Sequence, residues 1–147
     1  MFSSCSARCR LLISLLCLMA FQPGCGESRP KAYPTRGKVV FSDGSPVRLG
    51  TIELLSQEHK INATGTIQQD GSFVLGTWTP NDGACAGKHI AIVTQLIVND
   101  GMTKHQLDHG APVDPAYASY STSPLFVVIE AKDMNDIEFK VEKAIMK

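Results

Sequence analysis

The sequence predicts an all-β fold, specifically a seven-stranded antiparallel β-sandwich. From residue 36 onward, apolar and polar residues alternate with a period of two, which is expected of strands that bury one face. Glycine, aspartate and proline interrupt this alternation at short intervals and mark turns. No segment shows a clear amphipathic helical period. Short alternating strands at this spacing are typical of two packed antiparallel sheets.

The expected strands can be placed in order along the chain. Asp43-Gly44 is a tight-turn signal after the first strand, and Gln69 to Gly71 forms the turn between the third and the fourth. The fifth strand contains the longest apolar run and is expected to be central. The seven strands are predicted at residues 37–42, 50–56, 61–68, 72–77, 88–98, 124–130 and 136–142.

One face of each strand is expected to point into the core, because successive side chains of a strand point to opposite sides. In 136–142, for example, Phe139 lies between Glu138 and Lys140 and is therefore assigned to the core face. The residues predicted to face inward are Val39, Phe41, Ile52, Leu54, Phe73, Leu75, Ile90, Ile92, Val127, Ile137 and Phe139.

Residues 1–24 have the pattern of a secretory signal peptide. Arg8 and Arg10 give a positive start, and Leu11 to Phe21 is an uninterrupted apolar run. The run is too short to span a bilayer, which needs about 20 apolar residues. The sequence therefore predicts that the protein is exported from the cytosol.

Cys25 decides between two outcomes of export. Gly24-Cys25-Gly26 resembles the core of a bacterial lipobox, so Cys25 is predicted to be lipidated and to anchor the protein to a membrane of the cell envelope. The alternative is an ordinary cut, for example after Gly26, which gives a periplasmic or secreted protein. Lipidation leaves Cys85 as a lone thiol, whereas the alternative permits a Cys25–Cys85 disulfide.

The rest of the chain is expected to be a flexible tether at 25–35, rich in proline and polar residues, and one domain at 36–147. Without Arg8 and Arg10 the chain has 12 basic and 14 acidic residues, a formal net charge of −2, and the two signs are interspersed. This balance argues against a nucleic-acid partner, whose phosphates call for a basic patch.

Residues 99–124 form a long expected connection with several chemically active side chains. His105, Asp108 and His109 could form a three-ligand zinc or iron site, because residues four apart share a helix face. We favour no metal, since two histidines at this spacing are common by chance and the H-E-x-x-H motif is absent. Tyr117 and Tyr120 are proposed as part of an interaction loop.

Three segments carry a resemblance to a known family: KVVFSDGSPVRLGTIELLS, ATGTIQQDGSFVLGTWTPNDGACAGKHIAIV and PAYASYSTSPLFVVIE. In this order they resemble short bacterial lipoproteins, common in planctomycetes, with a carboxypeptidase-regulatory-like, or transthyretin-like, β-sandwich domain. The resemblance covers residues 36–143 and implies an Ig-like (prealbumin-like) sandwich. It also implies a non-catalytic module of the cell envelope. His89 stands where this family usually has tyrosine.

The sequence therefore favours a non-enzymatic envelope lipoprotein domain with a structural or protein-interaction role and no cofactor. No serine stands in a G-x-S-x-G context. The expected partners are the membrane and an unidentified envelope protein or polysaccharide. Two alternatives are a metal-binding protein or small metalloenzyme built on residues 99–124, and a carbohydrate-binding module using Trp78, Tyr117 and Tyr120.

Overall fold

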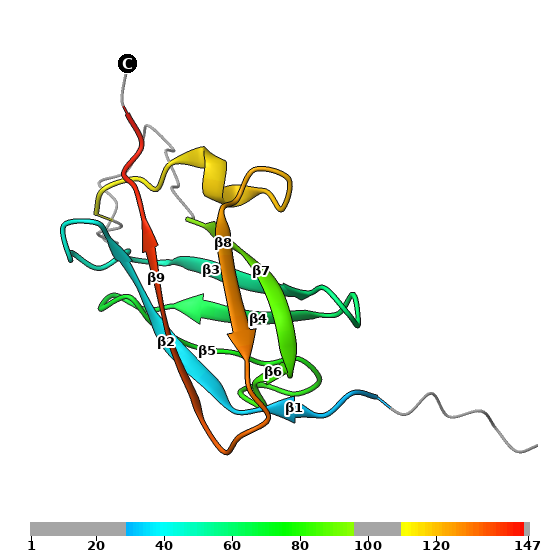
Figure 1. Ribbon diagram of the computed structural model, residues 1–147. Coiled ribbons are helices and arrows are strands. Elements are labelled where there is room, and N and C mark those ends of the chain that lie inside the picture. The colour runs from blue at the N-terminus through cyan, green and yellow to red at the C-terminus, as the bar shows by residue number, and fades with distance from the viewer. Residues whose placement is uncertain (1–28, 96–109, 146–147) are drawn as a thin grey trace, which may run out of the picture.

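A computed structural model describes residues 29–95 and 110–145. The predicted signal peptide, Cys25 and the metal candidates His105, Asp108 and His109 lie outside these ranges. The described parts contain nine strands and one short 3₁₀ helix (Figure 1). These elements are β1 (Ala32–Tyr33), β2 (Thr35–Phe41), β3 (Gly50–Ser56), β4 (Asn62–Ile67), β5 (Ser72–Val74), β6 (Ala84–Cys85), β7 (Gly87–Thr94), η2 (Pro115–Ala118), β8 (Leu125–Ile129) and β9 (Asn135–Val141).

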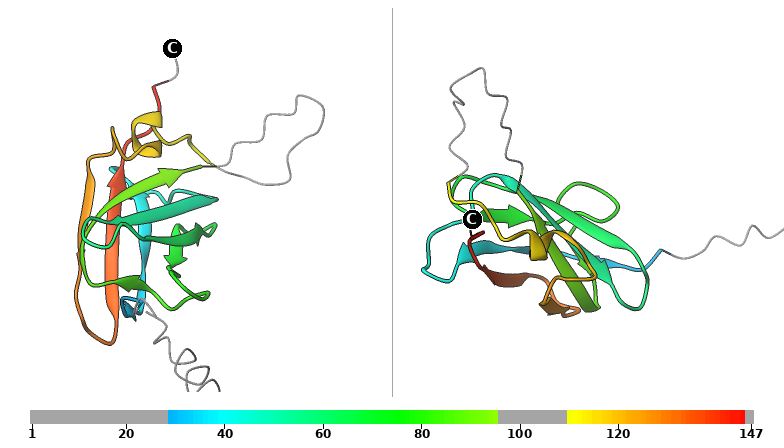
Figure 2. Two further views of the ribbon diagram at one scale, coloured as in Figure 1. Left: turned by 90° about the vertical axis from the view of Figure 1, so that its right-hand side faces the viewer. Right: turned by 90° about the horizontal axis from the view of Figure 1, so that it is seen from above.

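Two sheets pack face to face, as Figures 1 and 2 show, so the predicted β-sandwich is confirmed. One sheet has the strand order β4-β3-β7-β8, and the other has the order β5-β2-β9. The seven predicted strands correspond to these seven. The strands β1 and β6, of two residues each, pair with one another and were not predicted.

The prediction of purely antiparallel pairing is wrong for one pair, because β2 and β9 are parallel. A tight hairpin between two neighbouring strands would make them antiparallel. β9 instead follows β8, a strand of the opposite sheet, so no hairpin joins β9 to β2. Close approach of the two strands requires Gly37. A Cβ atom there would lie 2.0 Å from the Ile137 carbonyl oxygen and 2.8 Å from Cζ of Phe73.

The core lies between the two sheets, and most of the predicted inward residues are in it. Val39, Phe41, Ile52, Leu54, Phe73, Leu75 and Phe139 are buried, and the half-buried Val127 and Ile137 pack against them.

The assignment of β7 is wrong, because its core face consists of His89, Ala91 and Val93. Ile90 and Ile92 lie on the outer face, since Ile92 pairs with Glu53 and not with a core residue. Ile92 is nevertheless buried, and the η2 helix contacts β7. A strand covered on both faces has two apolar rows, so alternation alone could not identify the core row.

The folded domain begins earlier than the sequence indicated. Ala32 and Tyr33 form β1, and Thr35 is buried at the start of β2, although all three fall in the segment expected to be a tether. Tyr33 also packs against the core. Within the described ranges, no helix is long and apolar enough to cross a membrane.

Candidate functional site

The two predicted interaction tyrosines lie in and just after η2, and both contact the rest of the domain. Asp114 caps η2 by accepting a hydrogen bond from the Ala116 amide at 2.8 Å. Tyr120 donates its hydroxyl to Oε2 of Glu53 at 3.1 Å, and Tyr117 packs against core residues. Partial burial, together with the nearby Glu53 carboxylate, raises the pKa of Tyr120 to about 12. Both tyrosines thus attach this segment to the sheet, and their role in binding a partner stays a prediction.

The described residues contain no group of three or more potential metal ligands. His105, Asp108 and His109 are not among them, so the metal alternative stays a prediction. Cys85 is a buried free thiol, and burial followed by the charge of Asp82 raises its pKa. Because Cys25 is also outside the described ranges, the two outcomes proposed for it stay open.

Trp78, the tryptophan of the carbohydrate alternative, holds the N-terminal segment against the domain. Its indole N–H donates to the Pro30 carbonyl at 2.9 Å, and the Arg29 guanidinium lies 5.3 Å from the ring centre. This cation–π contact covers the ring on one side. Nothing in these contacts favours a platform for stacking a sugar.

Asp82 fixes the loop that carries Trp78. Its carboxylate accepts the backbone N–H groups of Thr77, Trp78 and Thr79 at 2.6, 3.0 and 2.9 Å. Partial burial alone would raise the pKa of Asp82, but these three donors outweigh it and hold the pKa below its ordinary value. The loop is therefore fastened by its own acid, which is a structural role.

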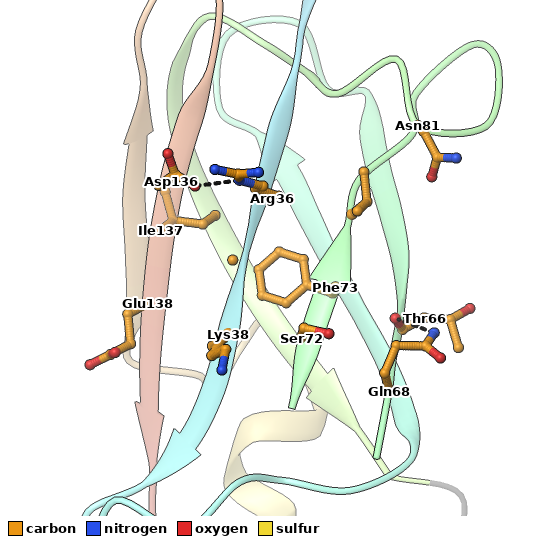
Figure 3. A pocket seen from close by; sticks show the side chains of 12 residues that line it. Arg36, Lys38, Thr66, Gln68, Ser72, Phe73, Asn81, Asp136, Ile137 and Glu138 are labelled. Carbon is orange, nitrogen blue, oxygen red and sulfur yellow. Dashed lines mark hydrogen bonds and ion pairs between the residues drawn. The ribbon is translucent and has the colours of Figure 1, made fainter. Parts of the chain in front are cut away.

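A hollow of about 820 Å³ lies over β2, β5 and β9 and reaches the end of β4 (Figure 3). Phe73 and Ile137 contribute its apolar surface. Arg36 and Asp136, which also line the hollow, form an ion pair at 2.6 Å. Within that pair the two charges compensate each other. No histidine is among the described residues that line the hollow.

The exposed margin of the four-stranded sheet is the most unusual surface in the described part of the protein. β8 is the last strand of that sheet, and its five residues, LFVVI, carry no charge. Phe126 is 67% exposed and Val128 is 59% exposed, on the outer face. Phe126 continues a row with the half-buried Ile90 and Leu55. We call β8 together with Ile90 and Leu55 the β8 edge.

The other sheet margins are protected, which sets the β8 edge apart. β9 presents the exposed charges Asp136, Glu138 and Lys140 on its outer face. At the β4 margin, Thr64 and Gly76 exchange two backbone hydrogen bonds of 2.9 Å. β5 has only three residues. Charged side chains, a neighbouring segment that covers the strand and a short strand length are the usual ways in which proteins block unwanted strand pairing.

Sequence reasoning did not identify this surface, although the signal was present. The sequence predicts a strand at 124–130 with Val127 facing inward, but it does not single out Phe126 and Val128, because apolar runs usually belong to strands buried on both faces. When such an uncharged run lies on a strand at a sheet margin, it can instead pair with another strand. Whether a strand lies at the margin depends on strand order, which the sequence does not show. In Figure 2 (left) β8, drawn in orange, runs along the margin of the molecule beside β9.

Comparisons with known proteins give little beyond this description. A search against protein-family models finds no match, and no curated protein is significantly similar. Among solved structures, the fold is similar to the crystal structure of BcpA, the major pilin subunit of Bacillus cereus, with a TM-score of 0.44 and 15% sequence identity. The match covers 78% of this chain and 31% of the pilin, so the chain spans less than a third of that protein. We transfer nothing from the pilin to this chain.

Proposed function

We propose that this protein is an exported, non-catalytic β-sandwich module that acts by binding another protein through the β8 edge. The observation that carries the proposal is the exposure of Phe126 and Val128 on an uncharged strand at an open sheet margin. Exposed edge strands with this composition pair readily with a further strand.

The physical basis is strand addition. A strand at a sheet margin leaves a row of backbone N–H and C=O groups directed away from its neighbour, and a partner strand can pair with them. Burial of Phe126 and Val128 adds about 1.5–3 kcal/mol for each side chain when it is complete. Backbone pairing then supplies affinity, and the apolar row supplies selectivity for an apolar partner strand.

The proposed location rests on the N-terminal sequence. The apolar run from Leu11 to Phe21 directs export, and lipidation at Cys25 then attaches the module to a membrane of the envelope. The domain begins at β1, only a few residues after Cys25, so the sandwich is held near the membrane surface.

The proposal is tested by site-specific photo-crosslinking in the cells that make the protein. A photoreactive amino acid at position 126 is expected to form a discrete protein adduct, because this side chain points outward at the β8 edge. The same residue at position 138 is the matched control, since Glu138 is also exposed on the margin strand of a sheet. Val128→Lys is expected to remove the adduct at 126 without unfolding the protein. No adduct at 126, or an equal adduct at 138, would refute the β8 edge as the docking surface.

A further inference from the structure

We infer that the partner at the β8 edge is a second copy of this chain, joined by antiparallel pairing of β8 with β8 of the other copy. This inference rests on the proposed function of the β8 edge and names its occupant. The two four-stranded sheets would become one eight-stranded sheet with the order β4-β3-β7-β8-β8-β7-β3-β4. Such a contact is isologous, because the same surface of both copies is used around a two-fold axis.

The length of β8 determines the register of this pairing. Pro124 precedes the strand and has no N–H group to donate, so the ladder is expected to begin at Leu125. Full overlap of two five-residue strands then places the two-fold axis at Val127. Leu125 of one copy lies opposite Ile129 of the other.

The side chains of β8 are complementary to themselves in this register. Phe126 of each copy faces Val128 of the other, and these are the two most exposed side chains of the strand. An aromatic residue opposite a β-branched residue is a favourable cross-strand pair. The two-fold symmetry produces this pair twice. Each pair extends the row of Leu55, Ile90 and Phe126 from one copy to Val128 of the other.

Charge favours the same occupant. β8 contains no charged residue, so two copies meet without opposing like charges inside the strand. Just beyond it, Glu130 of one copy lies opposite the uncharged Pro124 of the other, and Glu130 is already paired with Lys132 at 2.7 Å. Between the paired strands, from Pro124 to Glu130, the pairing therefore opposes no like charges.

Two double variants test both the contact and its register. In Phe126→Glu/Val128→Glu, the register opposes two carboxylates twice across the axis. In Phe126→Lys/Val128→Glu, it opposes an ammonium and a carboxylate twice instead. The variants remove the same apolar side chains, share the change at position 128 beside Lys88, and differ only at the exposed position 126.

The measurement is sedimentation equilibrium of the full chain, produced with its own N-terminal segment and solubilised in density-matched detergent. The native protein is expected to show a concentration-dependent dimer. The Phe126→Glu/Val128→Glu variant is expected to dimerise at least about tenfold more weakly than Phe126→Lys/Val128→Glu. A native protein that stays monomeric overturns the inference, and so does equal association of the two variants. Circular dichroism of both variants checks that the sandwich is retained.

The crosslinking experiment separates this inference from the proposed function. An adduct at position 126 with the mass of two copies supports both. An adduct with a different protein, together with a monomeric native chain, leaves the β8 edge as a docking surface and refutes the second copy as its occupant. No adduct at position 126 refutes both.

Discussion

Truncation of two phenylalanines to alanine should affect stability very unequally, because one lies in the core and the other on the β8 edge. Phe139 is 4% exposed in the middle of β9, and its ring stacks on Phe73 with the centroids 6.4 Å apart. Phe126 is 67% exposed within β8. The chemical change is identical, so a difference in unfolding reports the environment of the ring alone.

The expected magnitudes follow from burial. Removing a buried phenylalanine costs about 3–5 kcal/mol through lost transfer energy and the cavity left behind. With a urea dependence of about 1.5 kcal/mol per molar, Phe139→Ala should lower the unfolding midpoint by about 2–3 M. Phe126→Ala should change the free energy of unfolding by no more than about 0.5 kcal/mol when measured on dilute, monomeric protein. At high concentration the loss should grow, since a dimer stabilises the folded state by mass action.

Two controls make the comparison decisive. Phe139→Leu keeps most of the side-chain volume and should lose about 1 kcal/mol, so the core role can be measured even if the alanine variant does not fold. Glu138→Ala, next to Phe139 on the exposed face of β9, should leave the midpoint unchanged. Equal small effects of Phe139→Ala and Glu138→Ala would show that the register of β9 is wrong, because a shift by one residue exchanges its faces.

Three further predictions concern the anchor, the buried His89 and the half-buried Tyr120. Cys25→Ser should leave the sandwich folded and release the protein from membranes on fractionation; an unmodified N-terminal peptide starting after Gly26, found by mass spectrometry of the native protein, would contradict lipidation. Burial lowers the pKa of His89, so its neutral form stabilises the fold above the unfolded pKa of about 6.5, and this contribution is lost as the pH falls below that value. The urea midpoint should therefore fall between pH 7 and pH 5, and His89→Gln should make that dependence flatter; an unchanged slope would assign the effect to other groups. The pKa of Tyr120 is raised to about 12 in the folded state, against about 10 in the unfolded chain, so the protonated hydroxyl contributes to folding stability. This contribution is lost as the pH rises from about 10 toward 12. Tyr120→Phe should remove the tyrosinate absorbance that develops near pH 12, and an unchanged titration would place the shift elsewhere.

Local sequence signals identified the strands because the turns are fixed by nearby residues. Asp43 accepts hydrogen bonds from the amide and hydroxyl of Ser45, and Asp70 does the same for Ser72. Each of these aspartates precedes a glycine with a positive φ, at Gly44 and Gly71. Such contacts lie within two residues of the acid, so sequence alone contains the information that ends one strand and starts the next.

Features that depend on strand order could not be predicted in the same way. β2 and β9 are separated by nearly the whole domain, and only the crossing from β8 to the opposite sheet makes them parallel. The core face of β7 was misassigned because the η2 segment contacts that strand, and this contact forms only in the folded domain. Of the candidate site residues, Tyr117 and Tyr120 could be picked out from sequence, but their contacts with the sheet could not.

The β8 edge is the clearest case of a surface whose meaning comes from position. Exposure of Phe126 contributes little to the stability of the monomer, and an apolar strand at an open margin carries a risk of aggregation. The same chain places Asp136, Glu138 and Lys140 on β9, the margin strand of the other sheet, which lies beside β8. A single charge in β8 would give it similar protection at small cost, because the exposed positions 126 and 128 can carry one without entering the core. The uncharged strand is therefore best explained by a partner that covers it, and a second β8 in the register centred on Val127 covers both exposed side chains at once.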